Sequence, residues 1–268
     1  MITEAAILYA SKAYSEGDTG VGMQFAGKRE YVQSAFERIA PYYDGMNLFM
    51  SWGLIKRWQR FVISEAMLPK AAKILDVCTG TGELAILLAE KAGPDSEVIG
   101  LDMVEAMLEV ARKKVRKRKR SCTTKAGISF MTGDALRLPF LPESFNCVTM
   151  GFALRNVTNI YRAVSEMYRV CKKDGLVICL EISEPANVLW RAGFCLYFYH
   201  VIPLFGRLVD HDSGRSGRMP AYTWLRESMK GFPQGVEMTR IFSDAGLADV
   251  CYYPLHGGIV TVYRGTKL

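Results

Sequence analysis

The sequence lacks the patterns that mark a disulfide framework, a zinc site or a secreted chain. Its seven cysteines are odd in number, scattered, and contain no Cys-x-x-Cys pair. Most of them fall in predicted strands and helices, where a free cysteine behaves as a small hydrophobic residue. We therefore expect a reduced compartment and no disulfide or metal site. The first 25 residues lack a basic end followed by an unbroken apolar stretch, so we expect no signal peptide.

Positive charge is not spread over the chain but is concentrated in one run. From Arg112 to Arg120, eight of nine residues are basic, whereas the net charge of all 268 residues is +7. The rest of the chain is therefore close to neutral. Such a run is either a solvated helix end or a docking site for anionic lipid headgroups or nucleic acid. Half of the residues are hydrophobic, which suits one large domain with additions and excludes wholesale disorder.

A glycine-containing turn follows the first strong strand pattern. Residues 74–83 read Ile-Leu-Asp-Val-Cys-Thr-Gly-Thr-Gly-Glu, and a helical pattern continues over 84–92. Glycines at such a turn let the backbone approach a ligand, and the following helix presents unpaired N–H groups at its first turn. Asp102 ends the next apolar run, at a distance that suits an acid binding ribose hydroxyls. The pattern predicts a nucleotide-type site.

Two kinds of cofactor fit this turn. Gly80-x-Gly82-x-x-Ala85 also satisfies the dinucleotide fingerprint, so the glycines alone do not decide between them. Asp76 argues against a dinucleotide, because a pyrophosphate would face a carboxylate at close range. A cofactor with a cationic sulfonium and an amino-acid head would instead be attracted to that carboxylate.

The spacing Asp76-x-x-x-Gly80-x-Gly82, the acid Asp102, and a third acid in Gly133-Asp134-Ala135 resemble the class I S-adenosylmethionine-dependent methyltransferases. In that family the second acid binds the ribose hydroxyls and the third borders the adenine. The resemblance therefore implies S-adenosyl-L-methionine as the cofactor. The cofactor-binding residues that we expect are Asp76, Thr79, Gly80, Thr81, Gly82, Asp102, Met103, Asp134, Ala135 and Gly151.

Strand and helix patterns alternate along the middle of the chain. Strands are predicted at 74–77, 98–101, 128–131, 145–150 and 176–181, with helices at 84–92, 104–119 and 158–171 and a tight turn at Asp174-Gly175. This alternation predicts a parallel sheet with helices on both faces. The last two runs, 248–253 and 259–263, are joined so closely that they can pair only antiparallel. The predicted fold class is α/β, a Rossmann-like seven-stranded sheet of the class I methyltransferase type whose last strand is antiparallel.

The chain divides into a tail at 1–27, a helical cap at 28–72 and the cofactor-binding domain at 73–268. The cap is predicted to hold helices at 28–40 and 54–67, joined by a turn-rich link at 42–47. A lid insertion is expected at about 185–230, and within it 189–209 carries an apolar stretch of about 15 residues, too short to span a bilayer. This stretch is either a buried core helix or an aromatic lid over a lipophilic substrate, and its place after the fifth strand favours the lid. Pro203 should bend or break it, and 210–220 should form a flexible surface loop.

Longer motifs resemble the ubiquinone/menaquinone biosynthesis C-methyltransferases over about residues 31–267. They are Phe36-x-x-Ile39-Ala40-x-x-Tyr43-Asp44-x-Met46-Asn47, Trp58-x-Arg60-Phe61, Phe152-Ala153-Leu154-Arg155-Asn156-Val157, Tyr168-Arg169-Val170, His200-Val-Ile-Pro203, and Gly257-Gly258 ahead of Tyr263-Arg264-Gly265. The resemblance implies methyl transfer to a ring carbon of a polyprenylated quinol. The ring is demethylmenaquinol or the methoxybenzoquinol precursor of ubiquinone, and we favour the naphthoquinol. The stretch 212–221 is longer, and the basic run more basic, than in the family.

We expect four residues to act on the substrate. Arg155 and Asn156 follow the fourth strand, and Arg155, which cannot be a base, would hold a water or the substrate oxygen as negative charge develops. Tyr43 and Asp44 would close the site from the N-terminal cap. His200 is a candidate proton acceptor because its ordinary pKa is near neutrality, although a histidine in an aromatic segment is more often a packed residue.

Partners and location follow from the same features. A lipophilic quinol is the expected substrate, and the run from Arg112 to Arg120 is a candidate contact with an anionic membrane surface. We expect a cytoplasmic protein, peripheral at the inner face of the membrane or free of it, with a homodimer as an open alternative. Another lipophilic small molecule is the alternative substrate. Nucleic acid is disfavoured because the Asn-Pro-Pro-Tyr type of motif for amino-group methylation of bases is missing.

Overall fold

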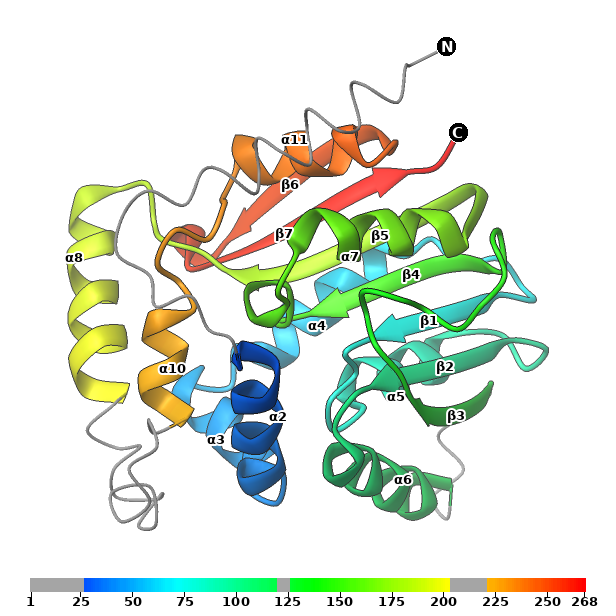
Figure 1. The fold of residues 1–268 in the computed structure, drawn as a ribbon, viewed down its shortest axis with the longest axis horizontal. Helices are drawn as coiled ribbons and strands as arrows, with labels where there is room; N and C mark the ends of the chain where they lie inside the picture. Colours follow the sequence, from blue (N-terminus) through cyan, green and yellow to red (C-terminus); the bar gives the residue numbers. More distant parts are fainter. Residues whose placement is uncertain (1–26, 120–125, 203–220) are drawn as a thin grey trace.

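The structure is a computed structural model, and it describes residues 27–119, 126–202 and 221–268. At its centre lies a seven-stranded sheet in the order β3-β2-β1-β4-β5-β7-β6 (Figure 1). β7 runs antiparallel to β5 and β6, whereas the other neighbouring strands are parallel. The predicted α/β fold with an antiparallel last strand is confirmed. The strands are β1 Lys73–Val77, β2 Glu97–Asp102, β3 Gly127–Thr132, β4 Phe145–Gly151, β5 Cys171–Ile182, β6 Ala248–Leu255 and β7 Val260–Thr266.

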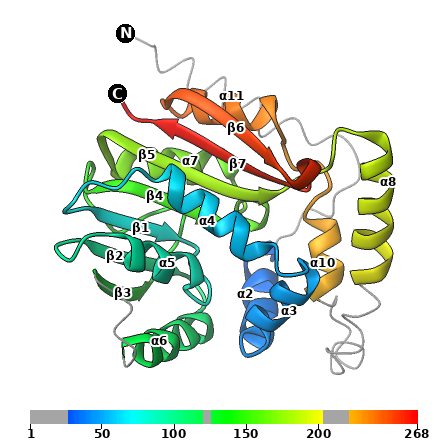
Figure 2. The ribbon, with the colours of Figure 1, turned by 180° about the vertical axis from the view of Figure 1, so that it is seen from behind.

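Helices cover both faces of this sheet. Successive side chains of a strand point to opposite faces, so Ile74 of β1 packs in a cluster with α4 and α5, while Leu75 packs in a cluster with α7 and α11. Figure 1 shows α7 in front of the sheet, and Figure 2 shows α4 and α5 on the opposite face. The helices are α2 Lys28–Ile39, α3 Tyr43–Met50, α4 Ile55–Glu65, α5 Glu83–Lys91, α6 Glu105–Lys119, α7 Ile160–Val170, α8 Val188–Leu196, α10 Ala221–Glu227 and α11 Val236–Asp244, with short turns η1 Leu154–Asn156, η2 Tyr197–Val201 and η3 His256–Gly258. With both faces covered, the carboxyl ends of the strands are the place for a site.

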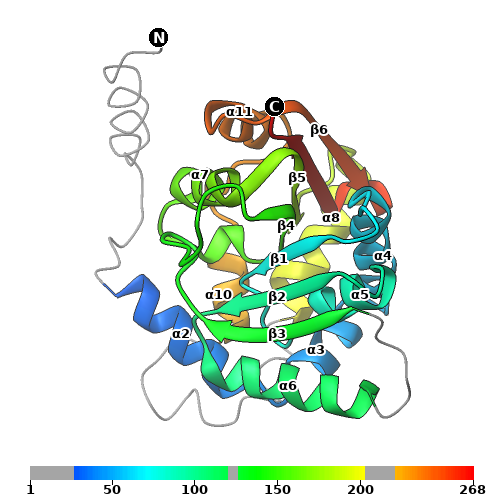
Figure 3. The ribbon, with the colours of Figure 1, turned by 90° about the vertical axis from the view of Figure 1, so that its right-hand side faces the viewer.

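The link predicted at 42–47 as turn-rich is a helix, α3, so that prediction is wrong. Tyr43 packs edge-on against Phe36 of α2, with ring centroids 5.9 Å apart. Met46 and Met50, one helical turn apart, pack against the cluster of Phe198, Ile202 and Met229. These tertiary contacts outweigh the turn propensity of the sequence Asp-Gly-Met-Asn. Of the predicted cap, α4 packs against one face of the sheet in the helical layer that contains α5, whereas α2 and α3 lie beyond the strand ends. Of these two helices, α2 lies beside α6 (Figures 1 and 3).

β5 starts earlier than predicted. Asp174 and Gly175 lie inside the strand and not in a turn before it, and Asp174 has a φ of 59°. The pairing of β5 with β4 jumps from Phe145↔Cys171 to Cys147↔Leu176. The prediction of a tight turn is therefore replaced by an irregular bulge, which absorbs the extra residues without ending the strand.

The described part of the lid insertion at about 185–230 consists of α8, the π-helical turn η2 and α10; we call α8 and η2 together the lid segment. Pro203 and the loop predicted at 210–220 lie outside the described residues. Within the described ranges, no helix is long and apolar enough to cross a membrane.

Candidate active site

The turn after β1 brings its backbone against the end of β2. The backbone N–H of Gly80 donates to Oδ2 of Asp102 at 2.8 Å. Gly82 adopts a φ of 74°, and a Cβ placed there would lie 2.8 Å from Cβ of Ala111 and 2.9 Å from the Phe130 ring. Position 82 therefore requires glycine both for its conformation and for the close approach of α6 and β3. This contact fixes the start of α5 beside the strand ends.

Asp76 lies at the bottom of a cavity beside this turn. Its carboxylate is 1% exposed and accepts hydrogen bonds from Oγ1 of Thr79 at 2.6 Å and from Oγ1 of Thr149 at 2.7 Å. Burial raises the pKa of Asp76 to about 6, against the lowering effect of the two hydroxyls. We call this space the headgroup cavity; its lining includes Asp44, Asp76, Thr79, Gly80, Thr81, Glu83 and Gly151.

A second cavity lies on the other side of Gly80, and we call it the adenosine cavity. Asp102 accepts from the backbone N–H of Val104 at 2.9 Å as well as from Gly80, and burial raises the pKa of Asp102. Asp134 pairs with Arg29 of α2 at 2.9 Å. The lining includes Gly80, Asp102, Met103, Gly133, Asp134, Ala135, Gly151 and Asn156.

Apart from Gly82, every residue expected to bind the cofactor lines one of these two cavities, and Gly80 and Gly151 line both. Gly82 is not part of either lining, because its role is to let α5 approach α6 and β3. The structure thus brings the three acids at the ends of β1, β2 and β3 to one edge of the sheet.

A third cavity is apolar, and we call it the aromatic cavity. Its walls come from the cap, from the lid segment and from the ends of β5 and β7, and they include Met50, Trp52, Ile55, Trp58, Ile182, Phe194, Tyr197, Phe198 and Ile259. Arg155 is the one charged residue in this lining among the described residues. Tyr43 and Phe152 line all three cavities, so the cofactor-type spaces and the aromatic space meet at these two rings.

Arg155 is held by a buried carboxylate that the sequence analysis missed. Nη1 of Arg155 lies 2.7 Å from Oε2 of Glu181 and donates to the carbonyl of Phe152 at 2.7 Å. The two side chains are 7% and 1% exposed, and Nε of Arg155 and Oε1 of Glu181 have no hydrogen-bond partner among the described residues. Burial raises the pKa of Glu181, and the Arg155 charge opposes this. An acid ending the fifth apolar run, as Asp76 and Asp102 end earlier ones, was the available signal.

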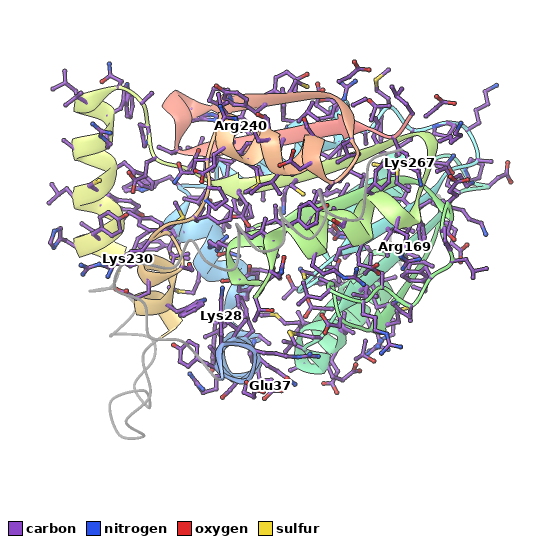
Figure 4. All side chains as sticks on the ribbon, turned by 45° about the horizontal axis from the view of Figure 1, so that its top comes forward. Lys28, Glu37, Arg169, Lys230, Arg240 and Lys267 are labelled. Carbon is purple, nitrogen blue, oxygen red and sulfur yellow. The ribbon has the colours of Figure 1, made fainter. Side chains whose placement is uncertain are left out.

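Asn156 lines the adenosine cavity and ties it to neighbouring helices. Its Oδ1 accepts from Nε1 of Trp224 in α10 at 2.9 Å. Nζ of Lys28 in α2 donates to the carbonyl of Val157 at 2.8 Å and lies 5.9 Å from the centre of a Trp224 ring, and burial lowers the pKa of Lys28 (Figure 4). The segment after β4 is therefore fixed from two sides.

His200 does not join this group. It lies exposed in η2, and it lines none of the three cavities formed by the described residues. The sequence placed it correctly in the lid segment, but η2 turns Phe198 inward and leaves His200 outside. We therefore assign no catalytic role to His200.

Comparisons with known proteins give a consistent result. Residues 24–267 match the profile of the ubiE/COQ5 methyltransferase family. The demethylmenaquinone methyltransferase of Bacillus pumilus is 38% identical over 241 residues, covering 90% of this chain and 98% of that protein. The protein of the same name from Symbiobacterium thermophilum is 39% identical over 240 residues, covering 90% and 94%.

Solved structures share the fold at low identity. A SAM-dependent methyltransferase from Aquifex aeolicus matches with a TM-score of 0.55 and 16% identity, over 78% of this chain and 89% of that one. Phosphoethanolamine N-methyltransferase 2 of Haemonchus contortus, solved with S-adenosyl-L-methionine, matches with a TM-score of 0.59 and 13% identity, over 92% and 61%. At such identities the likeness concerns the fold alone.

Proposed function

The chain belongs to the ubiE/COQ5 methyltransferase family and is an S-adenosyl-L-methionine-dependent methyltransferase, and from this premise we propose that it methylates a ring carbon of demethylmenaquinol. The observation that carries this proposal is the aromatic cavity. It is apolar, it holds one charged side chain, and it meets both cofactor-type cavities at Tyr43 and Phe152. A lipophilic ring with one polar edge suits such a space.

The two polar cavities suit the two ends of the cofactor. Asp76 carries negative charge in the headgroup cavity, where a sulfonium and an ammonium group would be stabilised. Asp102 and Asp134 line the adenosine cavity, and lone pairs of Asp102 that are not used by Gly80 and Val104 are available to ribose hydroxyls. When bound, the cofactor supplies an electrophilic methyl group on a positively charged sulfur.

Arg155 is the residue we assign to the reacting ring. Carbon methylation requires an electron-rich ring. Loss of the hydroxyl proton to solvent would give the ring oxygen a negative charge, and the methylated ring carbon would then release its own proton to solvent to restore the aromatic ring. Arg155 lines the aromatic cavity, and its guanidinium would stabilise such a charge in a site of low polarity. Tyr43 and Phe152 line all three cavities, so their rings would exclude water and position a bound ring beside the cofactor.

A methyl-transfer assay tests the proposed function. Purified protein with radiolabelled S-adenosyl-L-methionine should label a short-chain demethylnaphthoquinol, with a benzoquinol as the competing ring and transfer RNA as the control. Because the relatives are demethylmenaquinone methyltransferases, we expect the naphthoquinol to be the better acceptor. Labelling of transfer RNA, or of neither quinol, would rule the proposal out.

The raised pKa of Asp76 predicts a pH-dependent cofactor affinity. In the free enzyme the pKa of this carboxyl is about 6, above its ordinary value of 3.8. The protonated form therefore stabilises the free fold at low pH, and this contribution is lost as pH rises through about 6. A cationic cofactor favours the ionised form of Asp76, so binding below pH 6 must release the proton of this carboxyl. The Kd for S-adenosyl-L-methionine should therefore rise about tenfold for each unit by which the pH falls below 6. Calorimetry between pH 5 and 8 measures this slope.

Asp76→Asn is the matched variant for that experiment. It keeps the side-chain shape but removes the titrating group. The variant should therefore bind S-adenosyl-L-methionine more weakly than the wild type at pH 7.5, and its Kd should not change with pH. A wild-type affinity that does not change between pH 5 and 7 would show that Asp76 does not face the cationic end of the cofactor.

A further inference from the structure

The basic run from Arg112 to Arg120 belongs to α6 as far as Lys119, and much of it is turned toward the protein. Arg112 pairs with Glu105 of the same helix. Arg118 pairs with Glu83 at 2.7 Å and with Glu90 at 3.2 Å, both in α5. This pattern is that of a helix fastened to its neighbour, and it leaves fewer cations for a membrane surface than the sequence indicates.

Lys114 connects α6 to two other helices, α3 and α5. Its side chain is 19% exposed, and Nζ lies 2.6 Å from Oδ2 of Asp44 in α3 and 3.0 Å from Oε2 of Glu83 in α5. The other oxygen of Asp44, Oδ1, accepts from Oγ1 of Thr81 in the cofactor turn at 2.6 Å. One cation thus joins α3, α5 and α6.

We propose that Lys114 is a positioning residue that clasps α3 onto the cofactor turn. Asp44 and Glu83 both line the headgroup cavity, and the Lys114 ammonium group lies within ion-pair distance of both carboxylates, while Glu83 is also paired with Arg118. Without the Lys114 ammonium group, two like charges that share one small space would repel. Asp44 would then leave Thr81, and the helix that carries Tyr43 would move away from the junction of the three cavities. The basic run therefore contributes to cofactor binding.

Direct charge repulsion alone predicts the opposite change in cofactor affinity when Lys114 is removed. Lys114 is a cation beside a cavity that takes a cationic cofactor, so its removal would strengthen binding of S-adenosyl-L-methionine if charge repulsion were the larger effect. The demethylated product, S-adenosyl-L-homocysteine, has a neutral sulfur. Loss of a clasp weakens binding of both ligands equally, whereas loss of repulsion changes the affinity for the cationic one alone.

The test is calorimetric titration of Lys114→Gln with both ligands. We expect Kd to rise about tenfold for S-adenosyl-L-methionine and for S-adenosyl-L-homocysteine alike, as the loss of a partly buried ion-pair network implies. Lys117→Gln is the matched control, because Lys117 is an exposed lysine of the same helix with no ion pair to the described residues. That variant should stay within about twofold of the wild type for both ligands.

Two further variants separate positioning from general damage to the fold. Lys114→Arg keeps the charge and should recover most of the affinity, and Asp44→Asn should weaken binding from the α3 side even where Lys114→Gln fails to fold. The double variant Asp44→Asn with Lys114→Gln should lose less than the two single losses combined, because the carboxylates no longer repel. Unchanged affinity in Lys114→Gln, or tighter binding of S-adenosyl-L-methionine alone, overturns the proposal. No quinol enters this experiment, so its outcome is independent of the proposed substrate.

Discussion

The double substitution Arg155→Met with Glu181→Leu is expected to restore the stability that each single substitution removes, and yet to leave the enzyme almost without turnover. Each single substitution leaves one member of a buried ion pair without its partner, at a cost of roughly 3–5 kcal/mol. An apolar pair of similar volume removes both charges together and can be neutral or stabilising. The catalytic loss should nevertheless persist at about 10²–10³ in kcat, because the group that stabilises the ring oxygen is gone.

The two single variants should not be equally unstable. Glu181 can take up a proton when Arg155 is removed, since burial already raises the pKa of Glu181. When Glu181 is removed, Arg155 cannot become neutral, because a guanidinium stays charged. Glu181→Leu should therefore unfold at a lower urea concentration than Arg155→Met.

Urea unfolding, cofactor calorimetry and single-turnover methyl transfer together decide the outcome. The affinity of the double variant for S-adenosyl-L-methionine should be close to that of the wild type, because Arg155 and Glu181 line neither cofactor cavity. Recovery of turnover along with stability would show that Arg155 is merely structural. Persistent instability of the double variant would show that the charge pair is not what the single substitutions disrupt.

The parts of the site that could be predicted from the sequence are those fixed by local pattern. Asp76 lies one residue before the end of β1 and Asp102 ends β2, and parallel strands bring such ends to one edge of the sheet. Glycines at 80 and 82 mark the turn because φ values of 55° and 74° exclude most other residues. Periodicity and spacing are enough for these positions.

The remaining parts depend on contacts between distant segments. α3 forms because Phe36 and Phe198 pack against it, and neither contact is visible in the local sequence. The Lys114–Asp44 pair joins residues that are 70 positions apart, and Arg155–Glu181 joins residues that are 26 apart. From the sequence alone, the basic run of α6 indicates a charged surface. In the structure, Lys114 and Arg118 of this run pair with carboxylates of α3 and α5. His200 shows the same limit, since the side of η2 that it occupies depends on packing.

A substitution that fills the aromatic cavity is expected to weaken quinol binding without changing cofactor binding. Met50 ends α3 and lines this cavity but neither cofactor cavity. Met50→Trp should fill part of the space and raise the KM for the quinol about 100-fold, a value typical of an added side chain that forces a packed site to shift. The affinity for S-adenosyl-L-methionine should not change. Steady-state kinetics with a short-chain quinol, together with calorimetry of the cofactor, provides both measurements.

Leu141→Trp is the control for this variant, because Leu141 is 79% exposed and lines none of the three cavities. It adds the same ring at the surface and should leave both constants unaltered. An equal rise in the cofactor Kd and in the quinol KM of Met50→Trp would mean that the substitution displaces α3 and Tyr43 and does not merely fill the cavity. A normal KM would place the acceptor elsewhere, because Met50 lines the aromatic cavity and an indole at this position would reduce the space for a ring. The size of the KM change therefore tests where the acceptor binds, and the cofactor affinity tests whether the cap has stayed in place.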